Sequence, residues 1–251
     1  MPHAAIAGAG LAGRLVAWRL ARAGWRVSLF DRAARDDRRP ASHVAGAMLS
    51  PLADGVGSDG TVFDLAQRSM ALWPAWLTEL QHDSGQPVYH RREGTLVVAH
   101  PVDRANLTHF EQVLRQKLPP THQGLVRPLD GSSLDTLEPA LARRFAHGLH
   151  LVGEGQLAND ELLAALTVAL DRFRIEWFDG CEVGTLAAGE LQTADGPCRA
   201  DVVIDTRGLG ARGRWPGLRG VRGEVLTVEC DGVVLQRPVR LMHPRYQLYV
   251  A

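Results

Sequence analysis

The sequence predicts an α/β fold that begins with a dinucleotide-binding βαβ unit. In Ala4–Arg32 a short apolar stretch, a glycine-rich turn, a helical stretch and a second apolar stretch follow one another. A continuous apolar stretch returns at Ala200–Asp205 and again ends in a glycine-rich turn, as a buried parallel strand does. Because α/β folds place ligands at the carboxyl ends of parallel strands, both turns are candidate ligand-binding positions.

The βαβ unit divides into three predicted elements. We expect a strand over Ala4–Ala7, a helix from Leu11 to about Ala23 and a second strand over Arg26–Phe30. Gly24 is the expected end of the helix, since glycine commonly follows the last helical turn.

The turn after the first strand carries the spacing G-x-G-x-x-G at Gly8, Gly10 and Gly13. These glycines allow a tight turn, close approach of a pyrophosphate, and close packing of helix on strand. Asp31 lies 18 residues beyond Gly13, where a carboxylate would accept hydrogen bonds from ribose hydroxyls. The spacing alone is compatible with NAD as well as FAD.

Composition excludes several other classes of function. The 251 residues carry 28 basic and 28 acidic side chains, so neither nucleic acid nor an anionic membrane is expected as a partner. Three cysteines are too few for a disulfide framework, which favours the cytoplasm, and the histidines do not cluster as metal ligands. No apolar run is long enough to span a membrane, and the N-terminal apolar residues belong to the first strand. The sequence allows a homo-oligomer.

The segment Ala41–Gly55 is composed mostly of small residues and follows a charged loop that ends at Pro40. It contains too few large side chains to form a core by itself. We expect its backbone to pass close to a flat ligand.

The remaining pattern predicts alternating helices and strands. Helices are expected over Thr61–Gln81, with a kink or break at Pro74, and over Pro101–Leu118, Ser132–Leu141 and Glu161–Arg172. Strands are expected over Pro87–His90, Gly94–Ala99, His147–Val152 and within Arg174–Gly196.

A βαβ unit that ends in an acid, followed by Ala45-Gly46-Ala47-Met48-Leu49, resembles the D-amino-acid oxidase family of flavoproteins. The glycine oxidases of thiamine biosynthesis are the most similar members. That family has Ala-Ala-Gly-Met-Leu along its flavin, so Gly and Ala are interchanged here. The resemblance continues in Leu134–Pro139, Thr206-Arg207-Gly208, a strand within Gly220–Cys230 and a hairpin over Val239–Ala251. It implies FAD as the cofactor.

The resemblance also implies the site residues. The catalytic, substrate-facing tyrosine matches Tyr249, with Tyr246 as the alternative. Val183 matches a valine whose backbone meets the adenine. The full set of expected FAD contacts is Gly8, Gly10, Leu11, Ala12, Gly13, Asp31, Arg32, Ala41, Ser42, Gly46, Ala47, Met48, Val183 and Gly208.

The expected architecture is α/β, or α+β overall, with a Rossmann-like FAD-binding domain interleaved with an antiparallel-sheet substrate domain. The FAD-binding segments are expected at residues 1–80 and 146–215, and the substrate-domain segments at residues 81–145 and 216–251.

The implied reaction is oxidative deamination of glycine or another small D-amino acid, by hydride transfer to flavin N5. It yields an imine and, with O₂ as acceptor, H₂O₂, and it implies a place in thiamine biosynthesis. No side-chain base is required, and His43 is expected to be an ordinary loop histidine. The alternatives are a sarcosine oxidase-like secondary-amine oxidase or dehydrogenase, and an inactive FAD-binding remnant.

The last alternative follows from the end of the sequence. Ala251 falls inside an expected strand, before the Gly-x-Arg-Pro segment whose arginine binds the substrate carboxylate in the family. The sequence is therefore expected to be a C-terminally truncated member.

Overall fold

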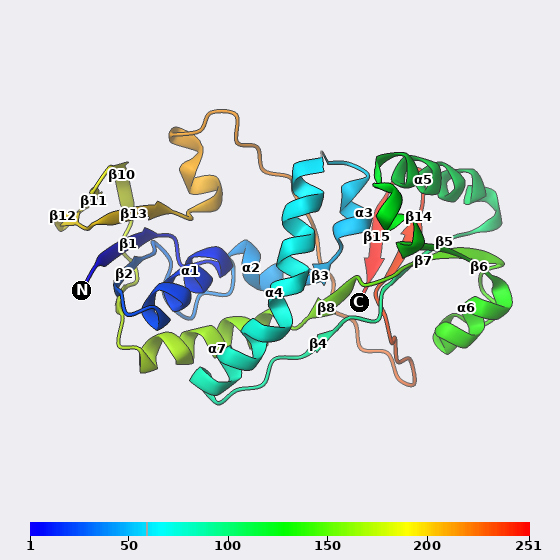
Figure 1. Cartoon of the computed structure of the whole chain (residues 1–251), viewed down its shortest axis with the longest axis horizontal. Coiled ribbons are helices and arrows are strands. Elements are labelled where there is room, and N and C mark those ends of the chain that lie inside the picture. The colour runs from blue at the N-terminus through cyan, green and yellow to red at the C-terminus, as the bar shows by residue number, and fades with distance from the viewer. Residues whose placement is uncertain (59) are drawn as a thin grey trace. The chain divides into compact units, whose positions relative to one another are not determined.

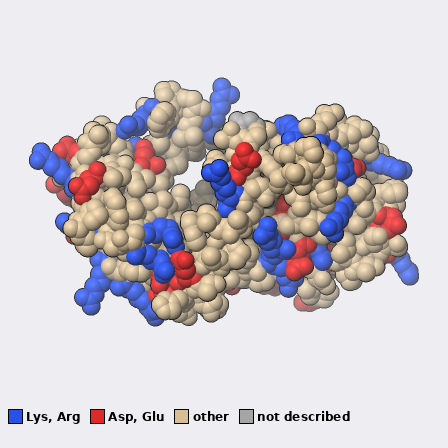
Figure 2. All heavy atoms as spheres, viewed as in Figure 1, with Lys and Arg blue, Asp and Glu red and all other residues tan. Residues whose placement is uncertain are grey.

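We analysed a computed structural model that describes residues 1–58 and 60–251. The chain forms two compact units and passes between them several times (Figure 1). Unit 1 comprises Met1–Ala45, Leu77–Val88 and Asn159–Leu226, and unit 2 comprises Gly46–Trp76, Tyr89–Ala158 and Thr227–Ala251. Basic and acidic side chains are interspersed over the face that Figure 2 shows, in keeping with their equal numbers.

Unit 1 is built on a parallel sheet with the strand order β13-β1-β2-β9. The strands are β1 (His3–Ala7), β2 (Arg26–Phe30), β9 (Glu176–Phe178) and β13 (Val202–Asp205). Every side chain from Ala4 to Ala7 is fully buried, because both faces of β1 are covered. The late strand pairs with β1 from Ala4↔Val202 to Ala7↔Asp205, so the predicted shared sheet is confirmed.

Two helices of unit 1 pack against each other, α1 (Leu11–Arg22) and α7 (Asn159–Arg172). A small antiparallel sheet of β10 (Val183–Ala187), β11 (Glu190–Thr193) and β12 (Gly196–Arg199) completes the unit. Its Val183 and Leu191 pack with Ala5, Ala7 and Phe30, which joins the two sheets through one apolar core.

Unit 2 contains a five-stranded sheet in the order β15-β14-β5-β7-β6. The strands are β5 (Thr95–Ala99), β6 (Val126–Asp130), β7 (His147–Leu151), β14 (Val239–Met242) and β15 (Gln247–Val250). All pairs are antiparallel except β14 with β5. Alternate residues of β5 enter two different cores, Val97 with Phe110 on one face and Leu96 with Leu134 on the other.

The helices of unit 2 cover this sheet and frame a second, smaller one. They include α3 (Pro51–Gly55), α5 (Arg104–Lys117) and α6 (Gly131–Leu137), with short 3₁₀ turns at Pro101–Asp103, Pro120–Leu125 and Pro139–Leu141. The small sheet has the order β3-β8-β4, with β3 (Met48–Leu49), β8 (Gly155–Leu157) and β4 (His90–Arg91).

Helix α4 (Gly60–Ser84) continues through Pro74, so the predicted kink or break does not end it. Met70, Trp73 and Leu80 are buried on both sides of the proline. Their packing offsets the backbone hydrogen bond that a proline removes.

The prediction of a strand within Gly220–Cys230 is wrong. The described backbone of this segment forms no strand, and Val221 and Leu226 are 96% and 88% exposed. High β-propensity alone does not make a strand where no neighbouring strand supplies the hydrogen bonds.

The bounds of the two units differ from the predicted domain bounds. Residues 46–76 and 146–158 group with unit 2 because β3 and β8 pair there and β7 lies between β5 and β6. Residues 216–226 group instead with unit 1. In the part of the chain that the structure describes, no helix is long and apolar enough to cross a membrane.

Candidate functional site

Two glycines of the first turn are required by the packing of unit 1. Gly8 has a φ of +102°, and a Cβ added there would lie 2.6 Å from the carbonyl oxygen of Thr206. A Cβ on Gly13 would lie 1.8 Å from the carbonyl oxygen of Gly8. The backbone that follows β13 therefore leaves no space for a side chain at Gly8, and the close approach of α1 to the turn leaves none at Gly13.

Gly10 is different, because nothing in the described protein requires it. A Cβ added there would meet only Ser42 Oγ, at 3.9 Å, and the φ of −67° suits any residue. No described side chain caps the start of α1, so the amides of Leu11 and Ala12 are open to a ligand. An open helix N-terminus behind a glycine that the fold does not need fits a pyrophosphate group.

Thr206 holds the glycine turn in place. Its amide donates to Ala7 O at 2.8 Å, and its hydroxyl lies 2.9 Å from Ala7 O and 2.7 Å from Gly8 O. In the sequence, Thr206 was noted only as part of the family-like motif Thr206-Arg207-Gly208, and this role was not predicted. A small polar residue directly after a late buried strand is the signal that could have shown it.

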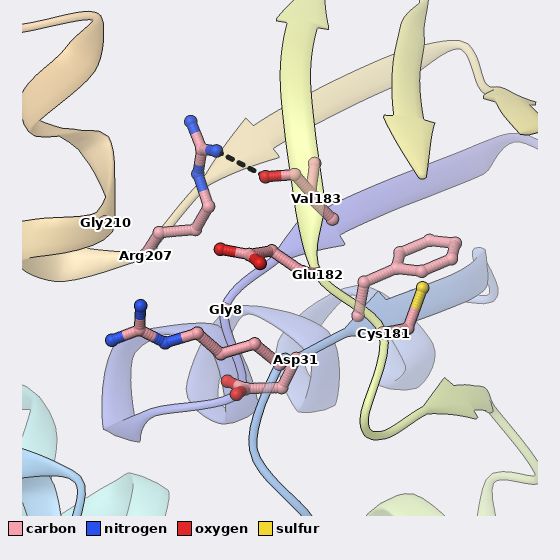
Figure 3. A pocket seen from close by; sticks show the side chains of 9 residues that line it. Gly8, Asp31, Cys181, Glu182, Val183, Arg207 and Gly210 are labelled. Atoms are coloured by element: carbon pink, nitrogen blue, oxygen red, sulfur yellow. Dashed lines mark hydrogen bonds between the residues drawn. The ribbon is translucent and has the colours of Figure 1, made fainter. Parts of the chain in front are cut away.

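Asp31 follows β2 and connects the turn to the next loop. Its Oδ2 accepts a hydrogen bond from the Ala9 amide at 2.5 Å, and its Oδ1 accepts one from the Ala33 amide at 2.7 Å. Asp31 and Arg32, two of the expected FAD contacts, line one pocket together with Gly8 (Figure 3). This carboxylate is therefore held at the edge of the glycine turn.

The opposite wall of this pocket is formed by Glu182, Val183 and Arg207 (Figure 3). Arg207 pairs with Asp205 at 2.9 and 2.8 Å and donates to Val183 O at 2.8 Å. The hydrogen bonds from Arg207 lower the pKa of the Asp205 carboxyl. Arg207, which the sequence did not predict as a site residue, thus fixes the predicted Val183 beside the pocket.

Three other predicted residues of unit 1 do not line this pocket, although Ser42 lies beside Gly10. Gly208 begins the 3₁₀ turn Gly208–Gly213 but does not line the pocket, whereas Gly210 does. Ala41 and Ser42 begin α2 (Ala41–Val44), whose Ser42 carbonyl accepts a hydrogen bond from Asn159 Nδ2 at 2.8 Å.

The predicted flavin-facing residues Gly46, Ala47 and Met48 lie in unit 2. Met48 pairs with Gln156 across β3 and β8. Ala47 has a φ of +52°, in the left-handed region that favours glycine, while nothing lies within 4 Å of a Cβ added to Gly46. The interchange of Gly and Ala therefore places the side chain at the more strained of the two positions.

Replacing Ala47 by glycine is expected to stabilise the protein by about 1 kcal/mol, because the left-handed backbone penalises a Cβ. Urea unfolding would measure this, with Gly46→Ala as the matched control, which should change the free energy of unfolding by less than about 0.5 kcal/mol. A loss of stability in Ala47→Gly would contradict the assigned conformation.

The predicted C-terminal hairpin is confirmed, since β14 and β15 pair antiparallel with Arg240 opposite Tyr249. Tyr249 lies over the Arg240 guanidinium at 5.1 Å, and its burial raises the pKa of its hydroxyl. Tyr246 is 65% exposed in the turn and stacks on His243. Of the two, Tyr249 is therefore the more constrained candidate.

No group of three or more His, Cys, Asp or Glu side chains suited to a metal ion occurs among the described residues. His43 lies in the short helix α2, and its Nδ1 is 3.2 Å from Asp160 Oδ1.

Comparison with known proteins shows a consistent set of relatives. A family described as FAD dependent oxidoreductase (DAO) matches residues 3–251. A putative thiamine biosynthesis oxidoreductase ThiO of Rhizobium etli is 36% identical over 245 residues, covering 98% of this chain and 66% of the relative. A glycine oxidase of Pseudomonas aeruginosa is 28% identical, covering 97% and 66%.

Solved structures are similar as well. A glycine oxidase from Geobacillus kaustophilus matches with a TM-score of 0.70 and 26% identity, covering 86% of this chain and 59% of that structure. An iminodiacetate oxidase from Chelativorans matches with a TM-score of 0.65 and 26% identity, covering 87% and 58%. The chain thus spans 66% of the length of each of these two relatives from Rhizobium etli and Pseudomonas aeruginosa.

Proposed function

Because the chain belongs to the DAO family of FAD-dependent oxidoreductases, we propose that it binds FAD and oxidises glycine or another small amino acid or amine. The observation that carries the FAD site is the open N-terminus of α1 behind Gly10, with Asp31 held at the edge of the same turn. The names of the similar glycine oxidases support the substrate class.

In this proposal each part of unit 1 has a role toward the cofactor. The amides of Leu11 and Ala12 bind the pyrophosphate, and Asp31 accepts hydrogen bonds from the ribose hydroxyls. Val183 and Arg32 line the place of the adenosine. In unit 2, the backbone of Gly46–Met48 lies along the flavin ring.

The chemistry of the reaction belongs mainly to the cofactor. When bound, FAD would supply the two-electron acceptor for oxidation of the C–N unit of a neutral amine, with O₂ as the final acceptor and H₂O₂ as its product. The Tyr249 phenol is protonated at neutral pH, and burial raises its pKa further, so its hydroxyl can donate a hydrogen bond to a substrate carboxylate. The imine product would serve thiamine biosynthesis, as the name of the Rhizobium relative suggests.

A second candidate substrate is a secondary amine. The likeness to an iminodiacetate oxidase favours it, since iminodiacetate carries its amine between two carbons. Anaerobic addition of glycine, sarcosine or iminodiacetate to the FAD-loaded protein should bleach the flavin absorbance, and the fastest bleaching identifies the class. A protein that binds no FAD would overturn the proposed function.

Replacing Gly10 by alanine is expected to weaken FAD binding by about tenfold or more while leaving the fold intact. The added Cβ has space inside the protein but would project where the pyrophosphate is proposed to lie. Titration of FAD by fluorescence quenching measures the affinity, and thermal unfolding measures the fold.

Gly213→Ala is the matched control for that experiment, because nothing lies within 4 Å of its added Cβ and it is not at the pocket. Its FAD affinity should equal that of the wild type. Unchanged FAD affinity in Gly10→Ala would place the cofactor elsewhere.

A further inference from the structure

A completely buried carboxylate, Glu154, lies in unit 2 and has no part in the function proposed so far. Its Oε1 accepts hydrogen bonds from the amides of Leu52 and Ala53, both at 2.8 Å. These amides begin α3, and both residues are buried in the core of unit 2. Without Glu154, two buried donors would lack their acceptor, which is costly inside a protein.

Glu154 is adjacent in the chain to a residue that pairs with the segment Ala41–Gly55. The next residue, Gly155, pairs with Leu49 in the β3–β8 ladder. A Cβ on Gly155 would lie 2.1 Å from Arg91 O, so β8 packs closely against the backbone of β4 at this point. The segment Ala41–Gly55 is therefore held at two nearby points: Leu49 pairs with β8, and the amides of Leu52 and Ala53 bind Glu154.

Arg240 binds the same turn as a donor, whereas Glu154 binds it as an acceptor. This arginine is only 8% exposed, and its Nη1 donates to Ala53 O at 3.1 Å. Its guanidinium lies 5.0 Å from the ring of Phe110 and 5.1 Å from that of Tyr249. Glu154 thus binds the amides of Leu52 and Ala53, and Arg240 binds the carbonyl of Ala53.

We propose that Glu154 and Arg240 are positioning residues that hold the Ser50–Ala53 turn and thereby set the place of Gly46–Leu49 and of Tyr249. This inference rests on the proposed function, in which Gly46–Met48 lies along the flavin and Tyr249 faces the substrate. Neither charged group touches the reacting atoms. They act through the backbone that they fix.

The ionisation of Glu154 supplies a signature that a purely structural contact would not show. Burial raises its pKa to about 7, while the hydrogen bonds from Ala53 and Leu52 act in the opposite direction. Among the titratable groups, Asp54 of α3 raises the pKa of Glu154 further, and Tyr249 of β15 interacts with Glu154 electrostatically. Arg240 of β14 reaches the same turn through Ala53 O.

The sign of the pH effect follows from this direction. An opened turn would hydrate Glu154 and return its pKa toward 4.5, so the closed turn binds the proton more tightly. Opening therefore becomes more favourable as the pH rises from about 4.5 to about 7 and levels off above that value. Glu154→Gln keeps an oxygen acceptor but cannot ionise, so this dependence should disappear.

Hydrogen–deuterium exchange of the FAD-free protein tests the turn itself. After correction for intrinsic exchange, peptides that cover Ser50–Gly57 should open about tenfold more often in Glu154→Leu, and detectably more often in Arg240→Met. Glu154→Gln should match the wild type at pH 5 and open less than it at pH 8. Glu93→Gln, an exposed carboxyl of the same unit, should match the wild type throughout.

FAD-loaded protein tests the link to the cofactor. Glu154→Leu should bind FAD at least about tenfold more weakly and lose the resolved shape of the flavin absorbance band, and Glu154→Gln should retain both. If Glu154→Leu does not fold, the pH dependence of exchange in the wild type against Glu154→Gln decides the question. An identical pH dependence in the two proteins would overturn the proposal.

The two proposals fail in different ways. A wild type that binds no FAD would refute the proposed function, while exchange would still report on the turn. FAD binding and an absorbance band that are unchanged in a folded Glu154→Leu would refute the positioning role alone.

Discussion

Replacing Gly13 by alanine is expected to destabilise the protein by roughly 3–5 kcal/mol, enough to abolish folding of unit 1 and FAD binding with it. The added Cβ would lie 1.8 Å from Gly8 O and 2.9 Å from Thr206 Oγ1, so α1 could not remain at its present distance from β1. Such a clash is with backbone and cannot be relieved by rotation of a side chain. Thermal unfolding and the yield of folded protein measure the effect.

Gly24→Ala provides the graded comparison for that result. Gly24 has a φ of +80°, but nothing lies within 4 Å of its added Cβ, so only the left-handed backbone is penalised, by about 1–2 kcal/mol. If Gly13→Ala were no worse than Gly24→Ala, the close contact between α1 and the glycine turn would be incorrect.

Replacing Glu138 by leucine is expected to destabilise unit 2 by roughly 3–5 kcal/mol. Glu138 is completely buried, and its Oε2 accepts hydrogen bonds from the amides of Gln236 and Arg237 at 2.9 and 3.2 Å. The Arg237 guanidinium lies 3.9 Å from the same oxygen and would be left without its countercharge. Because Arg237 lies two residues before β14, the substitution should also weaken the pairing of β14 with β5.

Urea unfolding followed by circular dichroism would measure this loss. Glu111→Ala is the control, since its i,i+4 pair with Arg115 is a partly exposed pair within α5 and is worth about 0.5 kcal/mol or less. Glu138→Gln keeps an oxygen acceptor for the two amides and should lose less stability than Glu138→Leu. Equal stability of Glu138→Leu and the wild type would show that this carboxylate does not hold the segment.

Local pattern was sufficient for the elements that build the nucleotide half of the molecule. The strand Arg26–Phe30 has the predicted bounds, and β1 and α1 differ from prediction by a single residue at one end. Asp31 and the three glycines also lie where their spacing placed them. The hydrophobic periodicity, the glycines and the terminal acid all lie within about thirty residues. Contacts with distant parts of the chain therefore changed these predictions little.

Prediction failed where local pattern and tertiary pairing disagree. Gly220–Cys230 has the composition of a strand and forms none, because a strand depends on a partner that composition does not specify. At Pro74 the predicted alternative of a break is wrong, because α4 continues through the proline, with Met70, Trp73 and Leu80 buried on its two sides.

The sequence by itself determined the family, the class of cofactor and the position of the glycine turn. The glycine turn depends on a spacing within a few residues, and the family and the cofactor depend on several short motifs, each local in the chain. Only the tertiary structure decided which partners Thr206, Glu138 and Glu154 have. Thr206 reaches Gly8 across 198 positions and Glu154 reaches Leu52 across 102. A buried polar group is defined by what lies opposite it after folding, and no local spacing records that partner.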